Sequence, residues 1–169
     1  GGATEPQMPA PAPTQAAGDV ISLFSDAFTD VAVDTWRTPW SNVTFEDVTV
    51  DGNATKKYSL MDVAGIETTS STVNATEMTM VHMDVWSSDF TQFSIKLVDF
   101  GADNAFAGGD DSEHQVDIMM PEQGGWVSID IPLSDFVNLQ SRANLAQYIL
   151  VAQPSGTATV FVDNFYFYK

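Results

Sequence analysis

From Asp19 onward, the sequence is divided into nine short segments in which apolar and polar residues alternate. The segments are rich in Val, Ile, Phe and Thr, and clusters of Gly, Asp, Asn and Ser separate them. A period of two predicts β-strands with one buried face. The expected strands are Val20–Ser25, Thr44–Val50, Lys57–Val63, Thr79–Trp86, Phe93–Phe100, Gln115–Met120, Val127–Ile131, Tyr148–Ala152 and Thr159–Tyr168. Nine strands at this spacing, with little helical pattern, predict an all-β fold, an antiparallel β-sandwich of the jelly-roll type.

The first 18 residues have a different composition. Four prolines alternate there with Ala, Thr and Gln, at Pro6, Pro9, Pro11 and Pro13. Such a stretch favours extended polyproline II and has too few apolar side chains to form a core. We therefore expect residues 1–18 to be a linker and residues 19–169 to be the folded domain. A linker implies a neighbouring domain, so the chain is expected to be one module of a larger protein.

The charge of the chain excludes several partners. Its 23 acidic and 6 basic residues give a net charge of -17, which repels nucleic acids and anionic membrane surfaces. No apolar run approaches the roughly 20 residues that a membrane span needs. The chain has no cysteine, which excludes disulfides, thiol nucleophiles and cysteine-based zinc sites.

One predicted strand carries a mixed polar and aromatic face. In Thr79–Trp86, alternation places His82, Asp84 and Trp86 opposite the apolar set. If the next strand forms a hairpin with it, Lys96 joins the same surface. An aromatic ring among hydrogen-bonding groups suits a sugar, whose C–H face stacks while its hydroxyls bind polar groups. The alternative is a solvated sheet face on which Asp84 and Lys96 pair weakly.

A second aromatic group follows the first strand, in a segment without a clean period. Trp36, Arg37 and Trp40 lie close together there. We expect one tryptophan to pack inside the domain and the other to contact a ligand. The planar fork of Arg37 suits vicinal hydroxyls or a carboxylate.

Two aspartates point to calcium. Asp26 follows the first strand, and Asp163 interrupts the apolar last strand. The terminal strands of a sandwich often lie side by side, so the two carboxylates are expected to converge on a Ca²⁺ ion. The alternative is that the aspartates cap turns through their own backbone bonds. No motif for a nucleophile, a catalytic metal or a phosphate loop is present, and no catalytic residue is assigned.

The stretches 20–30, 34–36, 96–103, 125–136 and 160–164 resemble a known family. The strongest are Trp-Val-Ser-Ile-Asp-Ile-Pro-Leu-Ser-Asp-Phe and Phe-Val-Asp-Asn. They are similar to the galactose-binding-like carbohydrate-binding modules of secreted polysaccharide-degrading enzymes, often from marine bacteria. The resemblance implies a secreted, non-catalytic domain that is covalently linked to a catalytic domain. It also implies a structural calcium at Asp26 and Asp163. Sugar contacts are implied at Trp36, Arg37, Trp40, His82 and Trp86.

The net negative charge of the chain distinguishes between neutral and anionic polysaccharides as ligands. A strongly negative domain repels alginate and sulfated galactans, although salt screens the repulsion. A neutral β-glucan such as laminarin is therefore the expected ligand, and alginate or agar-type chains are the alternatives. Two other classes stay open: a jelly-roll glycosidase or lyase, and a structural surface domain without a sugar ligand.

Overall fold

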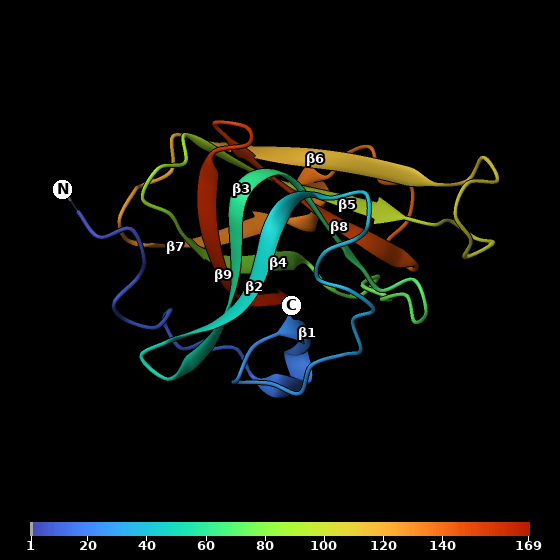
Figure 1. Cartoon of the computed structure of the whole chain (residues 1–169). Helices are drawn as coiled ribbons and strands as arrows, with labels where there is room; N and C mark the ends of the chain where they lie inside the picture. The colour runs from blue at the N-terminus through green and yellow to red at the C-terminus, as the bar shows by residue number, and fades with distance from the viewer. Residues whose placement is uncertain (1) are drawn as a thin grey trace.

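The computed structural model describes residues 2–169, which form nine antiparallel strands and two short 3-10 helices (Figure 1). In chain order the elements are η1 (Ala17–Asp19), β1 (Val20–Phe24), β2 (Asn42–Val50), β3 (Asn53–Glu67), β4 (Met80–Trp86), β5 (Gln92–Asp99), β6 (Ser112–Met119), β7 (Trp126–Pro132), η2 (Leu133–Asp135), β8 (Leu145–Gln153) and β9 (Ala158–Tyr168). Each predicted strand overlaps one of them, which confirms the all-β prediction. Within residues 2–169, no helix has the length and apolar character needed to cross a membrane.

The strands form one continuous sheet that folds into two layers. Its order is β6-β5-β8-β3-β9-β4-β7, with β1 added beside β9 and β2 beside β3. The long strand β3 joins the layers, because its first half pairs with β9 from Lys56 to Met61 and its second half pairs with β8 from Val63 to Glu67. One layer is therefore made of β6, β5, β8 and the end of β3. The other contains the start of β3 with β2, β9, β4 and β7.

The expected hairpin between the fourth and fifth strands is wrong. β4 lies between β9 and β7, whereas β5 lies between β6 and β8. The turn after β4 leads the chain across to the other layer. Its Ser87 hydroxyl accepts the backbone N–H groups of Asp89 and Phe90, and the Phe90 ring is fully buried. Burial of this ring between the layers favours the crossing over a return beside β4.

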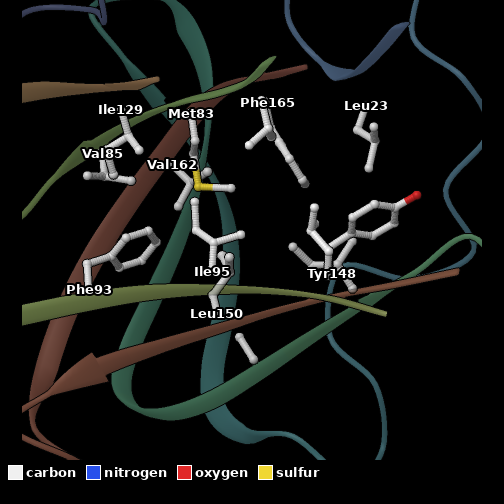
Figure 2. Packing of buried hydrophobic residues seen from close by; sticks show 14 of the residues in the cluster. Leu23, Met83, Val85, Phe93, Ile95, Ile129, Tyr148, Leu150, Val162 and Phe165 are labelled. Atoms are coloured by element: carbon white, nitrogen blue, oxygen red, sulfur yellow. The ribbon is translucent and has the colours of Figure 1, made fainter. Parts of the chain in front are cut away.

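The hydrophobic core fills the space between the two layers (Figure 2). Figure 2 shows side chains of β4, β7 and β9 facing side chains of β5 and β8. Its labelled residues are Leu23, Met83, Val85, Phe93, Ile95, Ile129, Tyr148, Leu150, Val162 and Phe165. Because alternate residues of each strand enter this core, the remaining residues of the same strands form two outer faces.

The N-terminal segment lies against the domain. Residues 2–16 contain no strand or helix, and they run along the outer face of β7, β4 and β9 before the chain enters β1. In Figure 1 this is the dark-blue chain on the side of β7 and β9. Trp126 Nε1 donates to the carbonyl of Met8 at 2.8 Å, and Asn164 Nδ2 donates to that of Pro11 at 2.9 Å.

Candidate functional site

The residues expected to bind a ligand are divided between the two outer faces. Lys96 belongs to the layer of β5, β6 and β8, and Trp40 lies over the same layer at its β3 edge. His82, Asp84 and Trp86 share one face of β4, as alternation predicts, but in the other layer. Lys96 is therefore not a neighbour of these three residues, because β4 and β5 do not pair.

The first surface is built by strand register. One row across the sheet joins Gln115 of β6, Lys96 of β5, Ile149 of β8 and Gly65 of β3. Trp40 lies over Gly65 at the end of this row. The flanking rows add Asp117 and Gln147. We call this surface the Trp40 platform; its members are Trp40, Lys96, Gln115, Asp117, Gln147 and Ile149.

The loop that carries Trp40 is tied to the backbone of β3. Thr38 N donates to the carbonyl of Gly65 at 3.0 Å, and Gly65 N donates to Ser41 Oγ at 2.9 Å. The hydroxyls of Thr38 and Ser41 are 2.7 Å apart and buried. Trp40 itself is 49% exposed. The aromatic ring is thus held in place while much of its surface stays open to a ligand.

Arg37 positions this loop. Its guanidinium donates to three backbone carbonyls, from Nε to Val43 at 2.9 Å, from Nη1 to Thr38 at 3.2 Å and from Nη2 to Ser41 at 3.2 Å. The side chain offers five N–H groups, so most of its capacity serves the loop. The sequence-based expectation of a free fork facing the ligand is corrected accordingly, since the fork faces backbone carbonyls on either side of Trp40.

Hydrogen bonds hold Gln115, Asp117 and Gln147 of the platform, and an ion pair holds Lys96. Gln147 Nε2 donates to Glu67 Oε2 at 2.7 Å, and Lys96 Nζ lies 3.7 Å from Glu113 Oε1. Asp117 accepts hydrogen bonds from Gln115 and Ser94, which lower the pKa of its carboxyl group. A fixed ring beside fixed donors and acceptors can stack on a pyranose and bind its hydroxyls.

The other loop tryptophan has a different environment. Trp36 packs against the hydrophobic core, and its ring meets that of Phe24 edge to face at 5.7 Å. The Lys56 ammonium group lies 4.9 Å from the Trp36 ring centre. The backbone carbonyl of Trp36 also accepts the buried hydroxyl of Tyr58 at 2.7 Å. Trp36 is therefore the one of the two loop tryptophans that packs against the core, and it is not a member of the Trp40 platform.

The second surface centres on His82. His82 Nε2 is 3.0 Å from Asp84 Oδ1, and His82 Nδ1 is 2.8 Å from Asp130 Oδ1. The Tyr166 ring stacks on the imidazole with a centroid distance of 4.7 Å. Burial lowers the pKa of His82, but the hydrogen bonds and charges of the two carboxylates outweigh it, and the pKa is raised. The imidazole is thus held by protein groups on both nitrogens.

The N-terminal segment covers this second surface. Trp86 is only 4% exposed, although it is on the outer side of β4, and residues 3–8 lie beside it. His82 is 8% exposed and shares a cavity with residues 11–15. These residues are therefore not open to a ligand while the segment is in place. The strand pattern gave no sign of this cover, because a proline-rich stretch carries no period that indicates where it packs.

Asp26 and Asp163, the two carboxylates predicted to bind calcium, line the same cavity. Asp163 is nearly buried, and its carboxylate already accepts hydrogen bonds from Asn53 Nδ2 and Asn164 N, both at 2.7 Å. Burial raises its pKa to about 6, and the negative charges of Asp26 and Asp84 contribute. The excess negative charge favours a cation. The donor set is small, however, since Ca²⁺ takes six to eight oxygens and no third acidic residue among residues 2–169 completes a cluster here.

A separate acidic group lies in the β5–β6 loop. One carboxylate oxygen from each of Asp103, Asp110 and Asp111 lies within 4.8 Å of the others. The loop is largely exposed, and its carboxylates accept backbone N–H groups of the same loop. Backbone N–H groups thus hold Oδ2 of Asp110 and Oδ2 of Asp111, whereas Oδ1 of each is buried without a hydrogen-bond partner among residues 2–169.

Comparison with known proteins shows that the fold of this chain resembles those of several solved structures. No family model and no curated protein matches the sequence. Among solved structures, a family 30 carbohydrate-binding module of a cellulosomal cellulase of Clostridium thermocellum is 13% identical with a TM-score of 0.63, covering 88% of this chain and 96% of that one. A family 11 module from the same organism, in complex with a β-1,3-1,4-mixed-linked tetrasaccharide, is 12% identical with a TM-score of 0.62 and covers 89% and 95%.

A family 29 module complexed with cellulohexaose is more distant, at 8% identity and a TM-score of 0.56, and covers 88% of this chain and 89% of its own. At such identities the comparison concerns the fold alone. The chain therefore has the β-sandwich architecture found in carbohydrate-binding modules of several families.

Proposed function

We propose that this chain is a non-catalytic polysaccharide-binding domain and that the Trp40 platform is its ligand site. The observation that carries the proposal is the half-exposed Trp40 ring, which is fixed over Gly65 at the end of a row that contains Lys96 and Gln115. A flat ring beside immobilised polar side chains matches the two requirements of a pyranose. The fold supports the same conclusion, because its solved neighbours are described as carbohydrate-binding modules.

A neutral β-glucan is the proposed ligand class, and laminarin is the proposed member of it. The glucan in the family 11 complex and the cellulohexaose in the family 29 complex are both uncharged. The platform itself contains one cation, Lys96, which lies near Glu113, and one anion, Asp117. With a net charge of -17 for the whole chain, a uronate polymer gains little and is repelled at low salt.

The expected role is to hold an attached enzyme on its substrate. Such a domain raises the effective concentration of the enzyme at the polysaccharide without adding chemistry. We propose that the full protein is secreted and carries a catalytic domain for an algal glycan.

Calorimetry against laminarin, mixed-linkage glucan, agarose oligosaccharides and alginate tests the proposal. We expect binding to a neutral β-glucan, and Trp40→Ala is expected to weaken it at least about tenfold. Phe106→Ala is the matched control, because Phe106 is an exposed aromatic residue of the β5–β6 loop, outside the platform. Equal loss in both variants, or no loss with Trp40→Ala, contradicts the site. Binding to alginate alone contradicts the ligand class, and binding to no member of the panel contradicts the function.

A further inference from the structure

The second surface holds the N-terminal segment through directed contacts. We call residues 5–15 the strap. Three side chains of the domain donate hydrogen bonds to it, from Trp126 Nε1 to the Met8 carbonyl, from Asn164 Nδ2 to the Pro11 carbonyl, and from the Tyr166 hydroxyl to Gln15 Oε1 at 2.7 Å. These donors come from two strands, β7 and β9. The strap is therefore fixed at three points along its length.

The spacing of the first two contacts fits a polyproline II helix. That helix has three residues per turn, so in this conformation carbonyls three residues apart, the separation of Met8 and Pro11, point the same way. Proline has no backbone N–H, and a proline-rich segment offers a partner mainly carbonyl oxygens and ring carbons. The domain supplies the complementary groups, namely an indole N–H, an amide NH₂ and a phenol O–H on an aromatic face.

Pro6 occupies the aromatic part of this face. Strand register places Trp126, Trp86 and Phe161 in one row across β7, β4 and β9. Pro6 is the buried residue of the strap, and it lines the cavity beside Phe161 as well as the cavity beside both tryptophans. Packing of a proline ring on a row of aromatic rings is the mode by which aromatic grooves bind polyproline II peptides.

The donors under the strap are built into the domain. Asn164 is nearly buried, and its amide also joins Asp84 Oδ2 at 2.8 Å and Ser25 Oγ at 2.8 Å. Tyr166 is held by its stacking on His82. Both groups are thus oriented by residues other than the strap, which is the property of a preformed site. The strap supplies no member of the hydrophobic core and pairs with no strand.

We propose that the outer face of β4, β7 and β9 is a recognition site for a proline-rich peptide, and that the strap is its ligand, bound within the same chain. The site is separate from the Trp40 platform, which lies on the other layer. The strap is thus a bound element of the domain that shields Trp86 from solvent.

The test uses the domain of residues 17–169, which retains every strand and core residue, and a synthetic peptide of residues 1–18. We expect the peptide to bind in titration calorimetry and to change the tryptophan fluorescence. A peptide with Pro6→Ala, Pro9→Ala and Pro11→Ala is expected to bind about tenfold more weakly or worse. Trp126→Phe in the domain removes one donor and keeps a ring, and it is expected to weaken the binding.

Absence of binding to a domain that unfolds cooperatively overturns the proposal, as does equal binding of the peptide that carries the three proline substitutions. A second experiment uses the full chain and decides the question if the shortened domain does not fold. In the Met-methyl NMR spectrum, Met8 reports on the strap. Trp126→Phe is expected to move the Met8 signal toward its position in the free peptide. An unmoved signal contradicts the role of Trp126. Glycan binding does not enter either readout, so this proposal and the proposed function fail independently.

Discussion

The indole of Trp40 lies directly on the backbone of Gly65. A β-carbon placed on Gly65 would come within 2.2 Å of Trp40 Cη2 and within 2.6 Å of Thr38 Oγ1. Only a residue without a side chain allows the loop to approach β3 this closely. Gly65 therefore determines the height of the aromatic ring above the sheet, and with it the shape of the proposed ligand site.

Gly65→Ala is expected to displace Trp40 and to weaken glycan binding about tenfold or more. The added methyl group cannot be accommodated unless the loop of residues 38–41 moves, and we expect a cost of about 1–3 kcal/mol in the free energy of unfolding. Calorimetry and urea denaturation measure the two effects. Gly18→Ala is the control, because a β-carbon there meets nothing within 4 Å. Unchanged affinity in Gly65→Ala would show that the ring position is irrelevant to binding.

The two loop tryptophans are expected to respond in opposite ways to replacement by alanine. Trp36→Ala removes a ring that packs on the core and on Phe24, so it is expected to cost about 3 kcal/mol of stability. Trp40→Ala removes a half-exposed ring and is expected to change stability by about 1 kcal/mol or less while it lowers glycan affinity. Chemical denaturation of both variants checks this. A larger loss of stability in Trp40→Ala than in Trp36→Ala refutes the assignment of roles.

Stability is expected to depend on the protonation of His82. Its pKa is raised above the ordinary 6.5 despite burial, because Asp84 on β4 and Asp130 on β7 stabilise the imidazolium. On β9, the Tyr166 ring stacks on the imidazole, and the Tyr168 hydroxyl donates to Asp130 Oδ1 at 2.9 Å. A raised pKa in the folded state means that the protonated form stabilises the fold. This contribution is fully present below pH 6.5 and is lost as the pH rises through the folded pKa.

The comparison of wild type with His82→Gln isolates the contribution of His82, because the other titratable groups are the same in both proteins. The difference in unfolding free energy is expected to be largest near pH 5.5 and to shrink toward pH 9. His114→Gln leaves one imidazole, whose NMR titration should have its midpoint above 6.5. A midpoint below that value, or a difference independent of pH, contradicts the prediction.

Local patterns were enough to predict the strands but not their neighbours. Alternation correctly placed His82, Asp84 and Trp86 on one side of β4, because the two faces of a strand follow from the period alone. The error concerned Lys96, and its origin is the crossing at Phe90. A five-residue connection fits both a hairpin and a passage between layers, and only burial of the Phe90 ring decides between them.

The packing of the strap over Trp86 could not be predicted either, and the reason is different. Residues 5–15 have the composition of a linker, and the face that receives them is assembled from strands far apart in the sequence. Gly65 is a similar case. A glycine inside a strand signals a close approach, but the sequence does not show that Trp40 is the residue that approaches.

Calcium at Asp26 and Asp163 is the remaining prediction from the sequence. A buried carboxylate beside two other negative charges gains from a cation. If the ion binds the folded state, saturating Ca²⁺ at about 100 times Kd adds about 2.7 kcal/mol, which raises the melting temperature by roughly 5–10 °C for a domain of this size. Calorimetric scans with Ca²⁺ and with chelator measure the shift.

Two variants separate this position from the acidic loop. Asp163→Asn is expected to abolish the calcium-dependent shift, and Asp103→Asn is expected to preserve it, because Asp103 belongs to the group with Asp110 and Asp111. The reverse pattern assigns the ion to the loop and refutes the site at Asp163. An identical melting temperature with Ca²⁺ and with chelator would show that the folded domain does not bind calcium. The carboxylate of Asp163 would then be held by Asn53 and Asn164 alone.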